Sequence, residues 1–226
     1  MNADVSHDAI TVLVVEDDQF TRTTLCAALR HHGLTVAGEA ENARDGLEFA
    51  KHAIPDAALL DLDLGGGPSG IDLAHALRQL DPKIGIVILT TYEDPRMAGH
   101  SLATLPDNTK YLLKRDLSDS AALPRALAEA VEASKGQVRA VITPPRPPRA
   151  TASLTETQLE VMRLVAEGYS NGGIAEKRTV TEGAVEKMIH RIGRQLAIDT
   201  ETQSNQRVLI AREYLRLTGA PVRRDG

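Results

Sequence analysis

The chain has 226 residues, of which 42% are hydrophobic and 25% are charged, and its formal net charge is −5. This composition is typical of a globular protein, and the length suffices for two domains. No apolar run approaches the roughly 18 residues of a membrane span, so we expect a cytoplasmic protein with no membrane partner. The single cysteine, Cys26, excludes an intramolecular disulfide and a cysteine-built zinc site, and its apolar neighbours predict a core position.

Apolar runs typical of buried strands alternate with helical patterns through the first part of the chain. Asp18 is expected to cap the first helix, and Gly33 to end it. Five such alternations predict an α/β doubly wound, five-stranded parallel sheet in a domain of residues 1–136. The strands are expected at 10–15, 35–39, 57–61, 84–90 and 110–113, and the helices at about 19–32, 43–52, 71–80, 95–103 and 119–134.

Polar side chains follow four of the predicted strands, at the edge of the sheet where open α/β proteins bind ligands. They are Glu16 and Asp17, Asp61, Thr90 and Lys114. Three converging carboxylates repel one another unless a cation lies among them, and an all-oxygen cluster suits octahedral Mg²⁺. A hydroxyl and an ammonium beside the metal are what a transferred phosphoryl group requires. Each residue also has a simpler interpretation, as a helix cap, a strand residue or a solvated charge.

The sequence contains four strings, VLVVEDD, ALLDLDL, IVILTT and YLLKRD. In this order and at these separations they resemble the receiver domain of two-component response regulators, and the resemblance covers about residues 8–136. The resemblance implies a flavodoxin-like fold, a sensor histidine kinase as partner and Mg²⁺ as cofactor. It implies Asp61 as phosphoacceptor, and Glu16, Asp17, Asp61 and the backbone carbonyl of Asp63 as metal ligands. It further implies Thr90 and Lys114 as phosphoryl-binding residues. It implies Tyr111 as the switch aromatic, whose side-chain rotamer changes with the position of Thr90. One departure is the glycine run at 65–67, which delays Pro68 and predicts a looser loop beside the site.

Prolines at 144, 145, 147 and 148 predict an extended linker over residues 137–153. The remaining residues, 154–226, carry four helical patterns. Thr155 and Gln158 form a capping-box pattern before the first, and Thr181 is expected to cap the third. On the last helix, the spacing predicts that Val208, Ala211 and Leu215 share one face. Short helices joined by a tight turn indicate helix-turn-helix geometry.

The string from Leu154 to Ile198 resembles the LuxR-type output domain of the NarL/FixJ class of response regulators. The resemblance implies double-stranded DNA as a partner, with Glu186, Lys187 and His190 facing the groove and Thr181, Arg191 and Arg194 placed for phosphates. Glu186, Ala184 and Met188 depart from the usual lysine, threonine and histidine, and a glutamate accepts from cytosine N4. Glycines at 172 and 173 weaken the second helix, so we expect a homodimer on two half-sites.

The sequence therefore predicts a phosphorylation-controlled, DNA-binding transcription regulator and not an enzyme beyond its own phosphoryl transfer and dephosphorylation. Two alternatives stay open. One is an interaction module that works without phosphorylation or without binding DNA. The other is a phosphatase using Asp61 and Asp63, which is disfavoured because Gly65 stands where that class needs a hydroxyl.

Overall fold

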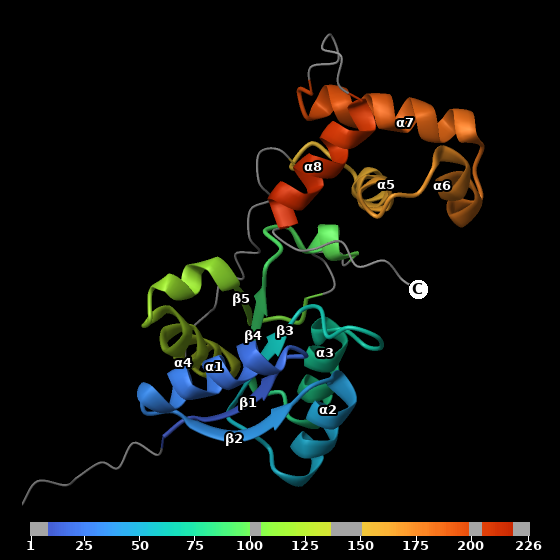
Figure 1. Cartoon of the computed structure of the whole chain (residues 1–226). Coiled ribbons are helices and arrows are strands. Elements are labelled where there is room, and N and C mark those ends of the chain that lie inside the picture. The colour runs from blue at the N-terminus through green and yellow to red at the C-terminus, as the bar shows by residue number, and fades with distance from the viewer. Residues whose placement is uncertain (1–8, 100–104, 137–150, 199–204, 219–226) are drawn as a thin grey trace, which may run out of the picture. The chain divides into compact units, whose positions relative to one another are not determined.

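The computed structural model describes residues 9–99, 105–136, 151–198 and 205–218 (Figure 1). These residues form two compact units. The first contains the described residues up to Thr90 and those from Leu105 to Gly136, whereas Thr91–Gly99 groups with the described residues from Thr151 on as the second unit. The domain boundaries expected from the sequence stay a prediction, and residues 137–150 of the expected linker lie outside the described residues. Among the described helices, none combines the length and the apolar character needed to cross a bilayer.

A five-stranded parallel sheet forms the centre of the first unit, in the order β2-β1-β3-β4-β5. This confirms the predicted doubly wound fold. The strands β3 and β4 are buried throughout, as expected for central strands covered on both faces. The bounds are β1 Thr11–Val15, β2 Thr35–Ala40, β3 Ala57–Asp61, β4 Gly85–Thr90 and β5 Thr109–Leu113.

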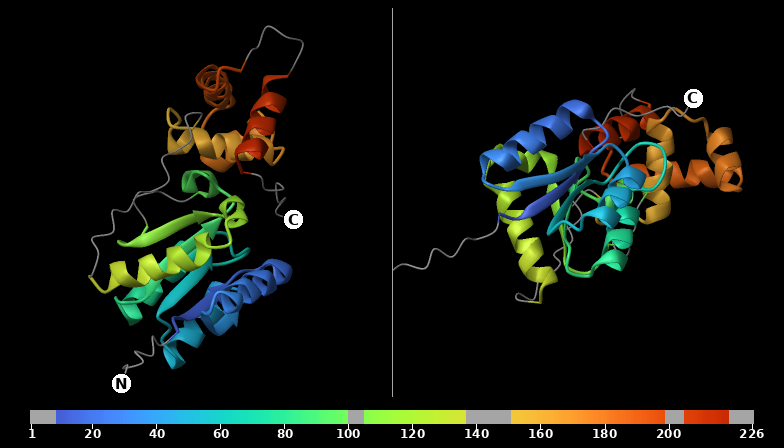
Figure 2. Two further views of the ribbon diagram at one scale, coloured as in Figure 1. Left: turned by 90° about the vertical axis from the view of Figure 1, so that its left-hand side faces the viewer. Right: turned by 90° about the horizontal axis from the view of Figure 1, so that it is seen from below.

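Helices cover both faces of this sheet (Figure 2). On one face, α1 (Gln19–His31) and α4 (Ala122–Ser134) share a core with alternate residues of β1, β3 and β4, and Cys26 lies in this core as predicted. On the other face lie α2 (Ala43–His52) and α3 (Gly70–Leu80). Asp18 caps α1 by accepting a hydrogen bond of 2.8 Å from the Thr21 amide, which confirms its predicted role.

Two details of this unit differ from the expectation. The last helix begins at Ala122 and not at Asp119, because a 3₁₀ turn, η3 (Lys114–Ser118), follows β5 and the Asp119 carboxylate instead accepts from the Ala121 amide at 3.0 Å. Phe20 fits the helical spacing of α1, yet its side chain is 80% exposed. Its position in the first turn places it beyond the edge of the sheet's core.

The helix expected from Pro95 to about Ala103 does not form as an α-helix over its first residues. A 3₁₀ helix, η1 (Pro95–Ala98), stands there, capped by Asp94 and ended by Gly99, whose φ of 85° lies in the left-handed region. Asp94 and Pro95 gave a correct start signal, but the left-handed glycine stops the helix after one turn. Residues 100–103 of the expected helix lie outside the described residues.

Four described helices form most of the second unit: α5 (Glu156–Ala166), α6 (Asn171–Arg178), α7 (Glu182–Gln195) and α8 (Gln206–Thr218). The predicted capping box is present, since Thr155 and Gln158 each bond the backbone of the other. The predicted face of α8 is only partly buried. Ala211 packs against the core, but Val208 and Leu215 are exposed, and the fully buried side chains are those of the neighbouring Ile210, Tyr214 and Leu217. Both sets recur at helical spacing, so spacing alone does not choose between them.

We expect Asp56 to stabilise the first unit in a pH-dependent way. Its Oδ2 accepts from the Thr11 amide at 2.9 Å and from the Thr11 hydroxyl at 2.7 Å, which joins the starts of β1 and β3. Partial burial favours a higher pKa for Asp56, but these hydrogen bonds hold the pKa below its ordinary value. A depressed pKa stabilises the folded state at pH values above the ordinary Asp pKa of about 4. This stabilisation is lost as the pH falls through the lower pKa of the folded protein.

Asp56→Ala should therefore lower the free energy of unfolding of the first unit by about 1 to 2 kcal/mol at neutral pH, with a smaller difference in acid. Asp56→Asn keeps an oxygen acceptor without the charge, so its loss should be smaller. Hydrogen exchange of the β1 and β3 amides, corrected for intrinsic rates, measures both. An Ala variant equally impaired at acid and neutral pH would contradict the charge-dependent contribution.

Candidate phosphoryl-transfer site and DNA-binding surface

The register of the sheet determines which side chains meet at its carboxyl edge. Val15 pairs with Leu60, so Glu16 follows β1 beside Asp61 at the end of β3. Asp61 pairs with Leu89, and Thr90 pairs with Leu113, so Thr90 and Lys114 continue the same line. The structure therefore brings these sequence-predicted residues to one edge of the sheet.

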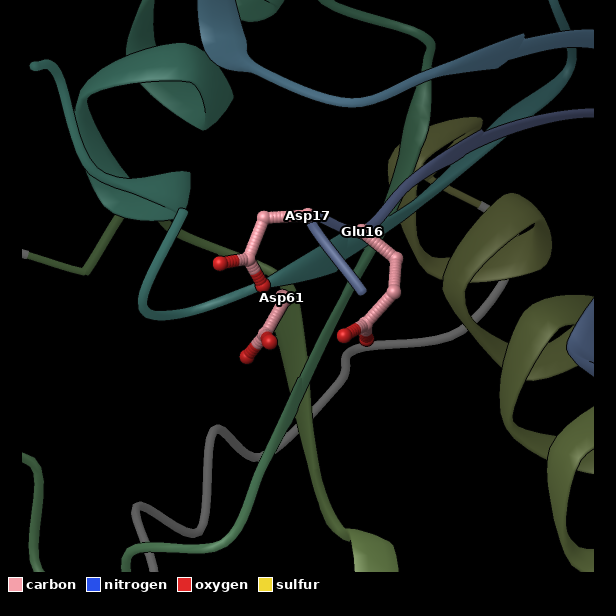
Figure 3. A group of neighbouring side chains, drawn as sticks. All are labelled: Glu16, Asp17 and Asp61. Carbon is pink, nitrogen blue, oxygen red and sulfur yellow. The ribbon is translucent and has the colours of Figure 1, made fainter. Parts of the chain in front are cut away.

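Three carboxylates converge there (Figure 3). Glu16, Asp17 and Asp61 each offer an oxygen within 4.8 Å of the others. Glu16 is 1% exposed and Asp61 is 7% exposed, whereas Asp17 is half-buried. The arrangement leaves one side of the cluster accessible through Asp17 while the other two groups are held inside the fold.

The Lys114 ammonium joins two of these carboxylates. Its Nζ donates to Glu16 Oε1 and Oε2 at 3.0 and 2.8 Å, and to Asp61 Oδ2 at 2.8 Å. Charge-assisted hydrogen bonds between partly buried groups are stronger than neutral ones. Lys114 therefore fixes the ends of β1, β3 and β5 to one another.

The charges at this edge are not balanced. Burial raises the pKa of Glu16 to about 7, and the neighbouring Asp61 carboxylate adds to this, against the opposing effect of Lys114. Burial also raises the pKa of Asp61 despite Lys114. For Lys114, burial favours a lower pKa, but Asp61 and Glu16 outweigh it and the pKa is raised. Lys114 thus bonds two of the three carboxylates, and further positive charge would stabilise the cluster.

The loop after β3 needs glycine at two positions, Gly65 with φ of 78° and Gly67 with φ of 120°. The Asp63 side chain is exposed and accepts from the Gly65 amide at 3.3 Å, while the Asp63 amide donates to Asp61 Oδ1 at 3.3 Å. The Asp63 backbone amide is therefore next to the Asp61 carboxylate, and the expected role of the Asp63 carbonyl as a metal ligand stays a prediction.

Thr90 and Tyr111, which the resemblance implies as switch residues, lie on the adjacent strands β4 and β5. Thr90 is 1% exposed at the end of β4. Tyr111 lies on β5 opposite Ile88 and is half-buried.

Two residues at the site escaped the sequence analysis. The Arg22 guanidinium, on α1, donates to the Glu16 backbone carbonyl at 2.5 Å and to that of Asp17 at 3.4 Å, so it holds the backbone that carries the acidic pair. Gly70 begins α3 against β3, where a Cβ atom would lie 2.0 Å from the Asp61 carbonyl oxygen. Ser69, which caps α3 before Gly70, was an available signal, whereas nothing local marks Arg22.

The predicted DNA-contacting residues lie on α7 in the second unit. Its inward side chains are Val185, Ile189 and Ile192. Thr181 caps the helix by accepting from the Ala184 amide at 3.3 Å. The remaining predicted residues are exposed, namely Glu186, Lys187, His190, Arg191 and Arg194. A helix with one buried and one polar, mainly basic face has the form of a recognition helix.

Comparison with known proteins matches both units. Residues 12–120 match the family model described as response regulator receiver domain, and residues 152–207 match that of bacterial regulatory proteins of the luxR family. The response regulator protein VraR of Staphylococcus saprophyticus is 28% identical over 199 residues, covering 86% of this chain and 94% of that protein. The nitrate/nitrite response regulator protein NarL of Escherichia coli K12 is 26% identical over 210 residues, covering 88% and 94%.

A solved structure of RcsB from Salmonella enterica, bound to the promoter rprA with a phosphomimetic, is similar with a TM-score of 0.56 and 21% identity, covering 92% of this chain and 98% of that one. At this identity the likeness shows the fold. A receiver fold followed by a helix-turn-helix unit defines the class of two-component response regulators. The chain belongs to the members of this class with a LuxR-type DNA-binding domain, those similar to NarL and VraR.

We expect Gly70→Ala to disturb the site. The added Cβ would overlap the Asp61 carbonyl, so either α3 or the end of β3 must move, at a cost of about 1 to 3 kcal/mol. Gly66→Ala is the matched control, since a Cβ there meets nothing within 4 Å. Hydrogen exchange of the β3 and α3 amides should rise in the Gly70 variant only. Equal behaviour of the two variants would contradict the close packing.

Proposed function

We propose that this response regulator is switched by a phosphoryl group that Asp61 accepts from a sensor histidine kinase, and that the phosphorylated form binds DNA as a homodimer to control transcription. The observation that carries the proposal is the convergence of three carboxylates and Lys114 at one sheet edge, beside buried Thr90. Burying carboxylates costs free energy, and burial raises the pKa of both Glu16 and Asp61, so such a cluster indicates a functional site.

The residues fit a Mg²⁺ ion. Three carboxylate oxygens lie within 4.8 Å of one another, and an all-oxygen ligand set with a surplus of negative charge suits this hard cation. Glu16, Asp17, Asp61 and the Asp63 backbone carbonyl would hold the ion. When bound, the metal supplies positive charge that offsets the charge on the transferred phosphoryl oxygens.

In the transfer step, an Asp61 carboxylate oxygen attacks the phosphorus of a phosphohistidine. The new P–O bond forms as the P–N bond breaks, and the imidazole leaves with the electron pair of that bond and takes up a proton. Lys114, which already bonds Asp61 Oδ2 at 2.8 Å, is close enough to pair with a phosphoryl oxygen. The Thr90 hydroxyl donates to another phosphoryl oxygen, and the side-chain rotamer of Tyr111 changes with the position of Thr90.

In the second unit, the exposed face of α7 would enter the major groove, with Glu186, Lys187 and His190 toward base edges. Thr181, Arg191 and Arg194 would contact phosphates. The exposure of these residues and the match to the luxR family support this assignment. A homodimer is supported by a solved structure of similar fold, in which two RcsB dimers are bound to two parallel DNAs.

Phosphorylation is tested by intact mass after incubation with acetyl phosphate and Mg²⁺. We expect the wild-type chain to gain one phosphoryl group, and Asp61→Asn and a sample with chelator to gain none. Lys114→Met should slow the gain by about a hundredfold or more, since it removes the cation that stabilises the transferring group. A gain that persists in Asp61→Asn would contradict the assignment of the acceptor.

DNA binding is tested by the salt dependence of affinity for a random-sequence duplex, which needs no knowledge of the operator. Arg191→Gln and Arg194→Gln should each weaken binding and reduce the slope of log affinity against log salt by about one. Arg44→Gln, at an exposed arginine on α2 of the first unit, is the control and should leave the slope unchanged. Absence of salt-dependent binding by the phosphorylated wild type would instead favour the interaction-module alternative.

A further inference from the structure

The segment from Thr91 to Gly99, called here the 91–99 segment, leaves the receiver sheet in sequence but packs within the second unit. Met97 is 1% exposed and belongs to the same hydrophobic core as Leu154, Tyr214 and Leu217, and Tyr92 packs against this core. The short helix η1 in this segment packs against α5, and its Met97 shares the core with Tyr214 and Leu217 of α8 (Figure 1). The helix-turn-helix unit therefore completes its core with residues from outside the LuxR-type sequence.

Polar contacts also hold this segment in the second unit. Asp94 is fully buried, and the Arg96 guanidinium pairs with it, with Nε 3.0 Å from Oδ1 and Nη2 2.7 Å from Oδ2. The same guanidinium donates to the backbone carbonyls of Leu154 at 2.9 Å and Thr151 at 3.2 Å, at the approach to α5.

A second polar contact comes from the other end of the unit. The Tyr214 hydroxyl, on α8, donates to the Met97 carbonyl at 3.1 Å. Buried charges and buried carbonyls are costly unless they are paired, so the segment and the two helices satisfy each other's groups.

The position of this segment in the chain links it to the phosphoryl site. Thr90 is the last residue of β4, and Thr91 is the first residue of the segment. Three residues separate Thr90 from the buried Asp94, which leaves little chain to absorb a displacement of Thr90.

We propose that the α5–α8 surface is a docking site for the chain's own 91–99 segment, and that this segment acts as a latch between Thr90 and the DNA-binding unit. The latch rests on the proposed function, because it takes phosphorylation at Asp61 as its input. A change at Thr90 pulls on the segment and alters its hold on α5 and α8. By linkage, the state of α5 and α8 biases phosphorylation in return.

The hold itself is tested without any phosphodonor, by hydrogen exchange of the full chain. Met97→Ala opens a cavity in the shared core, and Arg96→Met removes the bridge to Leu154 and Thr151. Both should raise exchange about tenfold or more in the 91–99 segment, α5 and α8 while leaving β1 and β3 unchanged. Arg216→Met, which removes an exposed ion pair with Glu213 on α8, is the control and should change little.

Unchanged exchange of α5 and α8 in Met97→Ala would overturn the docking site. Protection that is lost when the wild-type protein is diluted would show that a second copy supplies the segment, and would overturn a latch within one chain. Arg96→Met also strands Asp94, so the Met97 variant, which disturbs no charge, decides the matter if the two disagree.

The coupling is tested by adding beryllium fluoride and Mg²⁺. Exchange in the 91–99 segment, α5 and α8 should change at least about threefold in the wild type and not in Asp61→Asn. A response confined to the loop after β3 would overturn the latch as a coupling element. Failure of the proposed function has a different signature, namely no phosphoryl mass gain at Asp61 together with intact effects of Met97→Ala on α5 and α8.

Discussion

The bonds from the Lys114 ammonium to Glu16 and Asp61 are the interaction on which the first unit depends. They connect residues that lie far apart in the sequence, at the ends of β1, β3 and β5. Two buried carboxylates beside each other cannot both stay charged without a cation nearby. Lys114 supplies such a charge between Glu16 and Asp61, and a further cation at this edge would lower the repulsion among the three carboxylates.

Backbone contacts around this edge hold the charges in place. Arg22 holds the carbonyls of Glu16 and Asp17, and the absence of a side chain at Gly70 lets α3 approach the Asp61 carbonyl. Charge stabilisation is effective when its donors do not have to reorganise during the reaction. The left-handed backbone at Gly65 and Gly67 lies in the loop beyond Asp61, so the irregular conformation begins only after the strand that carries this carboxylate.

Local patterns predicted what local chemistry determines. Strand ends are visible as apolar runs that stop at polar residues, so Glu16, Asp61 and Lys114 could be placed at one edge before any coordinates. Arg22 could not be placed there. Its partners are backbone carbonyls, which leave no mark in the sequence, and an arginine in the first turns of a helix is common without such a role. The buried face of α8 was missed because Val208 and Ile210 begin two equally apolar stripes, and only the neighbouring helices decide between them. The early end of η1 depended on the left-handed conformation of Gly99, which the apolar spacing does not show, and η1 itself packs in the second unit.

That packing gives the DNA-binding unit a property that its own sequence does not show. Its core includes Met97, and both the backbone before α5 and the Tyr214 hydroxyl on α8 hydrogen-bond the 91–99 segment, so its stability is shared with a stretch that begins next to the phosphoryl site. The α7 surface carries Glu186 among basic residues, which weakens the attraction of a single copy to phosphates. Weak DNA binding by a single copy suits a switch. In the proposed function, a difference of about 1 to 3 kcal/mol between two states of the latch would then decide whether a homodimer stays bound to DNA.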